Sequence, residues 1–151
     1  MPLTIVRVQK ERFDLAAEIA PLTTGRSDVG AVVTFTGLCR DEAGTLSALE
    51  IEHYPGMAEE EIGRVVAQAL ARWPLEGVVA IHRCGMIRPG EPIVLVATAS
   101  RHRAEAFAAA EFLMDYLKTS APFWKKQHGK KPSTWVEAKA RDDAAREKWR
   151  G

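Results

Sequence analysis

LMDYLKTSAPFWKKQ, residues Leu113–Gln127, is the stretch in which a predicted helix stops and two lysines are left close to its end. Lys118 lies on the last helical turn, and Lys125 follows seven residues later. Pro122 lacks the amide donor that a helix needs and keeps the residue before it away from helical angles. The chain must therefore turn there, and we expect the turn to bring the two ammonium groups together.

This pair predicts two catalytic residues, Lys118 and Lys125. The aromatic residues after the proline place the turn in apolar surroundings, and a lysine in a partly dry place beside another cation has a lowered pKa. Such a lysine can act as an acid, a base or a nucleophile. The alternative is a solvated pair of cations after a helix C-terminus, where positive charge suits the helix dipole.

The totals predict a single domain over residues 1–151, with a charged helix or tail from about residue 140. A chain of 151 residues with 46% hydrophobic content is long enough for one core. A net charge of +1 gives no general attraction to nucleic acid or to an anionic membrane. Residues 101–131, however, carry seven Lys/Arg against three Asp/Glu. Any basic site is therefore local, and it includes the lysine pair.

Cysteine usage and hydropathy predict a reduced, cytoplasmic protein. Cys39 and Cys84 do not form a CxxC pair, and we find no signal peptide and no apolar run long enough to span a bilayer.

Apolar periodicity predicts an α+β fold. The expected strands are Leu3–Val8, Val29–Thr36, Leu46–Tyr54, Gly77–Cys84, Ile93–Ala99 and Thr134–Ala138. The expected helices are Phe13–Ile19, Ala58–Trp73, a third capped by Ser100 and running to about Thr119, and Ala140–Arg150. We expect the second and third strands to pair as a hairpin. An apolar seam on the third helix is expected in the core, formed by Phe107, Ala110, Met114 and Leu117.

Other residues with possible chemistry lie at element ends. Arg40 leaves the end of a strand, where a scaffold often places binding groups. His102 and Arg103 begin the third helix, where cations oppose the dipole but, with free amides, suit a phosphate; a solvent-facing first turn is the alternative. Cys39 is expected to be packed. His82 is expected to be a half-buried structural histidine, because no set with zinc-ligand spacing accompanies it.

The third helix separates its two basic ends. Arg103 and Lys118 are fifteen residues apart, which is about 22 Å along a helix. One small substrate cannot easily touch both ends. We therefore hypothesise that a two-fold dimer brings the Arg103 end of one subunit to the Lys118 end of the other.

Five segments resemble the large, catalytic subunit of the molybdopterin synthase family. They are GAVVTFTG at Gly30–Gly37, EHYPGM at Glu52–Met57, IHR.G at Ile81–Gly85, SRHR at Ser100–Arg103 and MDYLKT.APFWKK at Met114–Lys126. The matches run in order from about residue 29 to residue 139, and the last segment is the most specific.

The resemblance implies an α/β hammerhead fold with a mainly antiparallel sheet and packed helices. It also implies a homodimer at the centre of a heterotetramer, with a small ubiquitin-like sulfur-carrier partner on each side. The C-terminal Gly-Gly tail of that partner, as a thiocarboxylate, delivers sulfur to cyclic pyranopterin monophosphate, which becomes the dithiolene of molybdopterin. No cofactor and no metal are expected at this step.

Site residues follow from the same resemblance. Arg40, His102 and Arg103 are expected to hold the substrate, the last two from the neighbouring subunit. Lys118 is expected at the thiocarboxylate and Lys125 at the pterin, with the proton transfers not assigned between them. Four flanking residues are expected to line the pocket, namely Leu38, Cys39, Lys126 and Gln127, while Phe35 and Met114 shape its wall.

Two positions depart from the family pattern. Gln127 stands where glutamate is common, and Lys139, a weak site candidate, stands where arginine is common. A rival function is a non-catalytic binding module whose basic groove docks a peptide tail or a nucleotide. Such a module should tolerate Lys118→Arg, whereas a catalytic lysine should not. A nucleic-acid binder fits poorly, because the chain is nearly neutral and lacks interleaved aromatic residues.

Overall fold

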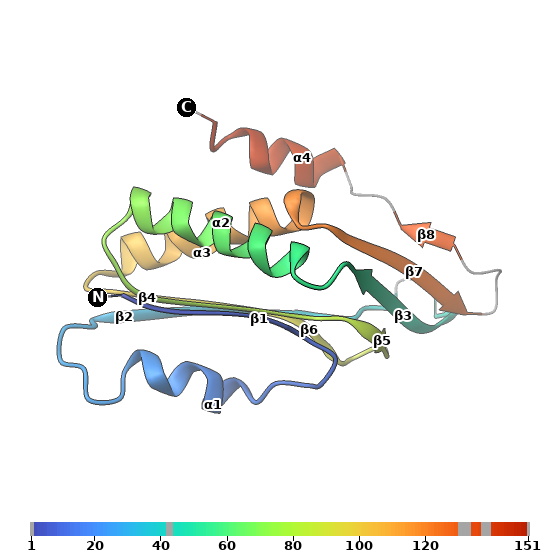
Figure 1. Cartoon of the computed structure of the whole chain (residues 1–151), viewed down its shortest axis with the longest axis horizontal. Helices are drawn as coiled ribbons and strands as arrows, with labels where there is room; N and C mark the ends of the chain where they lie inside the picture. The colour runs from blue at the N-terminus through green and yellow to red at the C-terminus, as the bar shows by residue number, and fades with distance from the viewer. Residues whose placement is uncertain (1, 42–43, 130–133, 137–139, 151) are drawn as a thin grey trace.

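A central sheet spans the length of the molecule (Figure 1). The computed structural model describes residues 2–41, 44–129, 134–136 and 140–150. The central sheet has the strand order β1-β4-β6-β2. Its strands are β1 (Leu3–Gln9), β4 (Leu75–Arg83), β6 (Pro92–Ser100) and β2 (Ala31–Leu38). The β1–β4 pair is parallel and the other two pairs are antiparallel.

Helices cover both faces of this sheet (Figure 1). The helices α2 (Met57–Arg72) and α3 (Arg103–Ser120) lie on one face. The short helix α1 (Leu15–Ile19) and a 3-10 turn (Ala20–Leu22) lie on the other. Because β4 and β6 are covered on both sides, their sequences are nearly continuous apolar runs rather than alternating ones.

The two faces of β4 and β6 build two separate cores. Toward α2 and α3, the largest buried side chains include Ile62, Val66, Val78, Val96, Phe112 and Leu113. Toward α1, they include Leu22, Val79, Ile81 and Leu95. Successive strand residues point to opposite faces, so Val78 and Val79 belong to different cores.

A second sheet extends beyond one end of the first (Figure 1). Its strand order is β5-β3-β7-β8. The strands are β5 (Gly85–Ile87), β3 (Leu46–His53), β7 (Phe123–Gly129) and β8 (Thr134–Val136). A small buried cluster of Cys39, Ile51 and Ile87 lies beneath it. The α+β class predicted from the sequence is confirmed.

The predicted hairpin between β2 and β3 is wrong. β2 pairs with β6, whereas β3 pairs with β5 and β7 in the other sheet. Asp41 accepts hydrogen bonds from the backbone amides of Thr45 and Leu46, which holds the turn that starts β3. The apolar β2 fits beside the fully covered β6, while the more polar β3 fits the thinner second sheet.

The third helix begins later than predicted, and one of its seam residues is exposed. Ser100 is not its N-cap; it is the buried last residue of β6, and its hydroxyl donates to the carbonyl of Pro74. His102 occupies the N-cap position with extended backbone angles. Ala110 and Leu117 are buried as expected, but Phe107 is 61% exposed, because it lies on the side of the helix away from α2.

The helix stops where Pro122 predicts, but the chain then enters a strand that the sequence did not suggest. α3 ends at Ser120, and Ala121 has extended angles of φ −68° and ψ 131°. The chain continues directly into β7, which pairs with β3 so that Lys125 lies opposite Ile51. The predicted turn is therefore a helix-to-strand junction.

The last helix, α4 (Ala140–Glu147), packs against α3 and matches the predicted polar terminal helix. Beyond it, Trp149 meets Trp73 and Phe112 edge-on, and its carbonyl accepts a hydrogen bond from Arg72. Of the predicted strand Thr134–Ala138, β8 is described and residues 137–138 lie outside the described residues, as does Lys139. Among the described helices, none has the length and hydropathy to cross a membrane.

Candidate active site

The end of α3 and the start of β7 enclose a pocket at the mouth of β2. The cavity measures about 100 Å³. It is lined by Phe35, Gly37, Leu38, His82, Ile93, Val94, Met114, Leu117, Lys118, Ala121, Phe123 and Lys125. Five elements of both sheets and α3 therefore meet here, and the structure brings the two lysines of the opening stretch into one pocket.

The two lysines sit in different surroundings. Lys118 is exposed on the last turn of α3. Lys125 is half-buried on β7, and its pKa is lowered to about 8, first by burial and then by the positive charge of Lys118. Asp142 of α4 acts in the opposite direction. An amine with a pKa near 8 is present in both protonation states close to neutral pH, which suits proton transfer.

The mouth of β2 leaves room for the pocket because of Gly37. A Cβ atom at this position would lie 2.7 Å from a Cγ atom of Val94. The register of β2 against β6 also shifts between Gly37 and Leu38. This irregularity releases Leu38, which is 58% exposed and lines the pocket as predicted from the resemblance.

His82 forms part of the pocket wall, which the sequence did not indicate. The side chain is 7% exposed, so it is buried rather than half-buried. Its Nδ1 lies 2.7 Å from the carbonyl oxygen of Arg83, and its ring stacks on Phe123 at 3.9 Å between centroids. Burial first, and then the nearby Lys125 and Lys118, lower the pKa of His82 to about 3. Phe123 is far away in the chain, so no local spacing could reveal this contact.

Three of the expected pocket residues lie elsewhere. Cys39 is buried against the second sheet, with its sulfur 3.9 Å from the carbonyl of Ile87, and burial raises its thiol pKa. Arg40 is exposed beyond the end of β2. Lys126 alternates with Lys125 along β7, so it lies on the opposite face, where it pairs in register with Glu50.

Gln127 is the fourth such residue, and it is exposed two positions beyond Lys125. It points to the same side of β7 as Lys125 but lies past the pocket lining. Phe35 and Met114 do line the pocket, as expected for wall residues. The weak candidate Lys139 lies outside the described residues.

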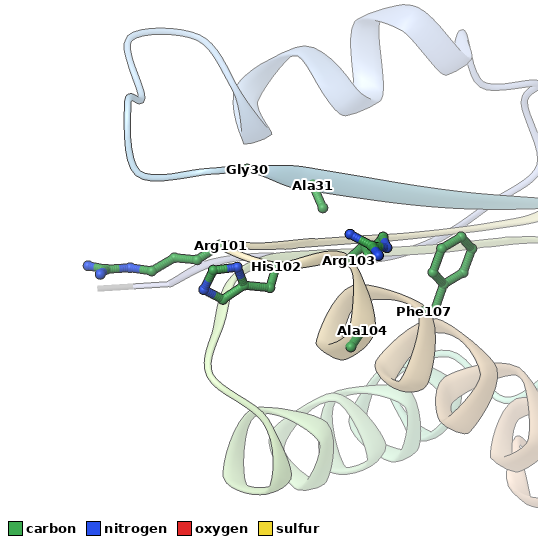
Figure 2. A pocket seen from close by; sticks show the side chains of 7 residues that line it. All are labelled: Gly30, Ala31, Arg101, His102, Arg103, Ala104 and Phe107. Atoms are coloured by element: carbon green, nitrogen blue, oxygen red, sulfur yellow. The ribbon is translucent and has the colours of Figure 1, made fainter.

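His102 and Arg103 form a second site at the other end of α3. A wider depression of about 550 Å³ is lined by Gly30, Ala31, Arg101, His102, Arg103, Ala104 and Phe107. Figure 2 shows Arg103 and Phe107 on the first turns of α3, close to β2, whereas Arg101 extends away from the group. A Cβ atom on Gly30 would lie 2.1 Å from the carbonyl oxygen of Arg101, so glycine permits β2 to begin this close to the helix. Within one chain, the two basic groups stay apart.

Comparison with known proteins identifies the family. The sequence model of the family described as "MoaE protein" matches residues 8–120. This chain belongs to that family. It is 65% identical to the molybdopterin synthase catalytic subunit of Mesorhizobium japonicum over 147 residues, covering 96% of this chain and 92% of the relative.

Solved structures of the MoaE family share the fold. The MoaE protein from Burkholderia ambifaria superposes with a TM-score of 0.83 at 45% identity, covering 99% of this chain and 98% of that one. A complex of subunits 1 and 2 of molybdopterin-converting factor from Helicobacter pylori contains a chain with a TM-score of 0.69 at 20% identity, covering 89% and 90%. At that identity the likeness concerns the fold.

The site of this MoaE protein offers cations and proton transfer rather than a protein nucleophile. Both cysteines are buried, and burial raises the pKa of Cys84 as it does that of Cys39. Among the residues that the structure describes, no group of three or more His, Cys, Asp or Glu side chains could hold a metal ion. A half-buried lysine of lowered pKa beside an exposed lysine is the chemically distinctive feature.

Proposed function

We propose that this MoaE protein is the catalytic subunit of a molybdopterin synthase. It transfers sulfur from the C-terminal thiocarboxylate of a small carrier protein to cyclic pyranopterin monophosphate, making the dithiolene of molybdopterin. The observation that carries the proposal is the pocket shared by Lys118 and Lys125, in which Lys125 has a pKa of about 8. The name and 65% identity of the Mesorhizobium relative support the same activity.

The chemistry needs a cation for an anionic tail and a group that exchanges protons. The thiocarboxylate sulfur bonds to a carbon of the substrate, and water then cleaves the bond between that sulfur and the carrier's acyl carbon. The carrier leaves as a carboxylate, and the displaced oxygen of the substrate leaves as water. Lys118, exposed at the pocket mouth, pairs with the tail, and Lys125 exchanges protons with the reacting groups. Because the sulfur arrives on the partner, the step needs neither a metal nor a redox cofactor.

The proposed assembly is a homodimer within a heterotetramer, working in the cytoplasm. Each subunit binds one ubiquitin-like sulfur carrier whose Gly-Gly tail enters the pocket beside Lys118. His102 and Arg103 of the neighbouring subunit, together with Arg40, bind the substrate's phosphate. This arrangement accounts for two basic sites at opposite ends of one helix.

An anaerobic assay tests the function. The protein is incubated with cyclic pyranopterin monophosphate and a thiocarboxylated carrier, and the dithiolene product is followed by mass spectrometry. We expect product from the natural sequence and none from Lys118→Ala. A Lys118→Arg variant keeps the charge, so retained activity would favour a docking role for this residue, whereas loss supports its role in catalysis. No product with a carrier that is shown to bind would overturn the proposal.

A further inference from the structure

The pocket has an uneven set of hydrogen-bonding side chains. Lys118 and Lys125 are its donors. The other described side chains that line it are apolar, with the exception of His82. His82 is therefore the one strong side-chain acceptor available to a ligand among these lining residues.

The structure assigns one tautomer to His82. A backbone carbonyl can only accept a hydrogen bond, so the 2.7 Å contact between Nδ1 and the carbonyl oxygen of Arg83 places the proton on Nδ1. In the neutral ring, Nε2 then carries the free lone pair. Stacking on Phe123, with 15° between the ring planes, fixes the direction of that lone pair.

The carbonyl that orients the ring is itself held firmly. The guanidinium of Arg83 donates to the carbonyls of Lys10 and Pro92, which ties the end of β4 to the segment after β1 and to the start of β6. His82 also lies in register with Val94 on β6. The acceptor is thus fixed before any ligand arrives, which reduces the entropy lost on binding.

The Nε2 atom is unpaired yet reachable. It has no hydrogen-bond partner among the described residues, although the side chain is 93% buried. The one described buried side-chain atom that is both sealed and unpaired is Glu105 Oε2. Nε2 therefore keeps access to the pocket. The charged or titratable groups that act on His82 are Lys125 of β7, Lys118 of α3 and His53 of β3, and together with burial they keep the ring neutral at physiological pH.

We propose that His82 Nε2 accepts a hydrogen bond from the last backbone N–H of the carrier's C-terminal tail. This inference rests on the proposed function. It makes His82 a residue that positions the tail, in addition to the lysines that meet its charge.

The tail fits this set of groups because its terminal glycine carries an amide N–H and a terminal acidic group on either side of one Cα atom. A lysine ammonium binds the acidic group, a neutral acceptor binds the N–H, and the apolar wall between them favours a residue without a side chain. A ring N–H of the pterin offers the same donor chemistry, so the experiment must separate the two sources.

The test removes only the N–H. Carrier protein in its carboxylate form is prepared by ligation with its last peptide bond as an amide or as an ester, and dissociation constants are measured with the whole catalytic subunit. We expect the ester to bind the natural protein about five- to tenfold more weakly. With His82→Phe, which keeps a ring on Phe123 but has no acceptor, amide and ester should bind equally. The weaker ester carbonyl affects both proteins alike and cancels in this comparison.

Two further arms cover the other outcomes. His82→Gln restores an acceptor oxygen and should regain part of the amide preference, which also tests the inference if His82→Phe folds poorly. The KM for cyclic pyranopterin monophosphate should stay within about twofold in His82→Gln. An equal ester penalty in the natural protein and in His82→Phe overturns the inference, as does no penalty in the natural protein. A raised pterin KM with an unchanged ester penalty would assign the N–H to the pterin and overturn the tail assignment.

The same experiment separates this inference from the proposed function. Sulfur transfer by the natural protein without a His82-dependent amide preference overturns the inference alone. Failure of the natural protein to bind either carrier overturns both.

Discussion

Lys125 carries its charge in a place that disfavours it. Burial, and then the charge of Lys118, lower its pKa from 10.5 to about 8. The folded protein therefore releases this proton at lower pH than the unfolded chain does. Below pH 8 the charged amine reduces stability by a constant amount, and between about pH 8 and 10.5 the free energy of unfolding rises as the proton is lost.

Replacing Lys125 by methionine should therefore stabilise the fold while abolishing sulfur transfer. We expect the melting temperature at pH 7 to rise by about 2–4 °C, and the advantage over the natural protein to shrink between pH 8 and 10.5. Denaturant unfolding at several pH values checks the pH dependence. Lys126→Met, on the opposite face of β7, is the matched control and should not raise stability. A destabilised Lys125→Met protein would contradict this account of the pocket.

The sequence could identify the two lysines but not every residue around them. Lys118 and Lys125 stood out because a helix end and a proline constrain the backbone between them. Cys39 and Lys126 were misplaced, since their direction depends on strand alternation in a sheet whose pairing was not known. His82 was missed as a pocket residue because its partner Phe123 comes from a strand paired elsewhere.

At the scale of elements, strand pairing was the part that local patterns could not determine. The buried strands β4 and β6 were predicted because their apolar runs are long and rich in β-branched residues. β7, with the sequence FWKKQHG, has no such run, and it becomes a strand by pairing with β3, far away in the chain. The β2–β3 hairpin failed for the related reason that neighbours in sequence need not be neighbours in a sheet.

The irregular end of β2 should be sensitive to a single methyl group. Gly37→Ala would place a Cβ atom 2.7 Å from Val94 Cγ1, so the strand or the pocket wall must shift. We expect the free energy of unfolding to fall by about 1–2 kcal/mol, and kcat/KM to fall at least tenfold because the pocket narrows. Urea unfolding and the product assay measure the two effects.

Gly63→Ala is the matched control for this substitution. Gly63 lies inside α2, with nothing within 4 Å of its added Cβ atom. The change should stabilise the helix by about 0.5–1 kcal/mol and leave activity unchanged. Unaltered activity in Gly37→Ala would show that the end of β2 is not part of the working pocket.

The C-terminal segment should contribute to stability through one tryptophan. Trp149 contacts the rings of Trp73 and Phe112, and its indole N–H donates to Asp115. Trp149→Ala should lower the free energy of unfolding by about 2–4 kcal/mol. Trp149→Phe keeps a ring in place and should lose about 1 kcal/mol, the value of the hydrogen bond. Thermal unfolding of both variants checks this, and equal losses would mean that ring packing contributes little.

At the scale of the whole molecule, α3 separates two basic sites that one substrate cannot bridge. Its eighteen residues run from Arg103 to Ser120, and the two depressions lie at its opposite ends. The large exposed fractions of Phe107 and Leu38, 61% and 58%, leave apolar surface beside each site. A two-fold dimer would cover such surface and join the Arg103 end of one subunit to the Lys118 end of the other.

Mixed dimers test the shared site. A dimer of one Lys118→Ala subunit and one Arg103→Ala subunit keeps one intact composite site and has one doubly altered site. Because random mixing makes half of the dimers mixed, we expect recovery of about a quarter of the natural activity from two inactive proteins. Lys118→Ala mixed with Lys125→Ala is the control, because both residues belong to the same pocket and no site in that dimer is complete. Recovery in the control, or none in the first mixture once mixed dimers are shown by mass spectrometry, would place all the catalytic groups within one subunit.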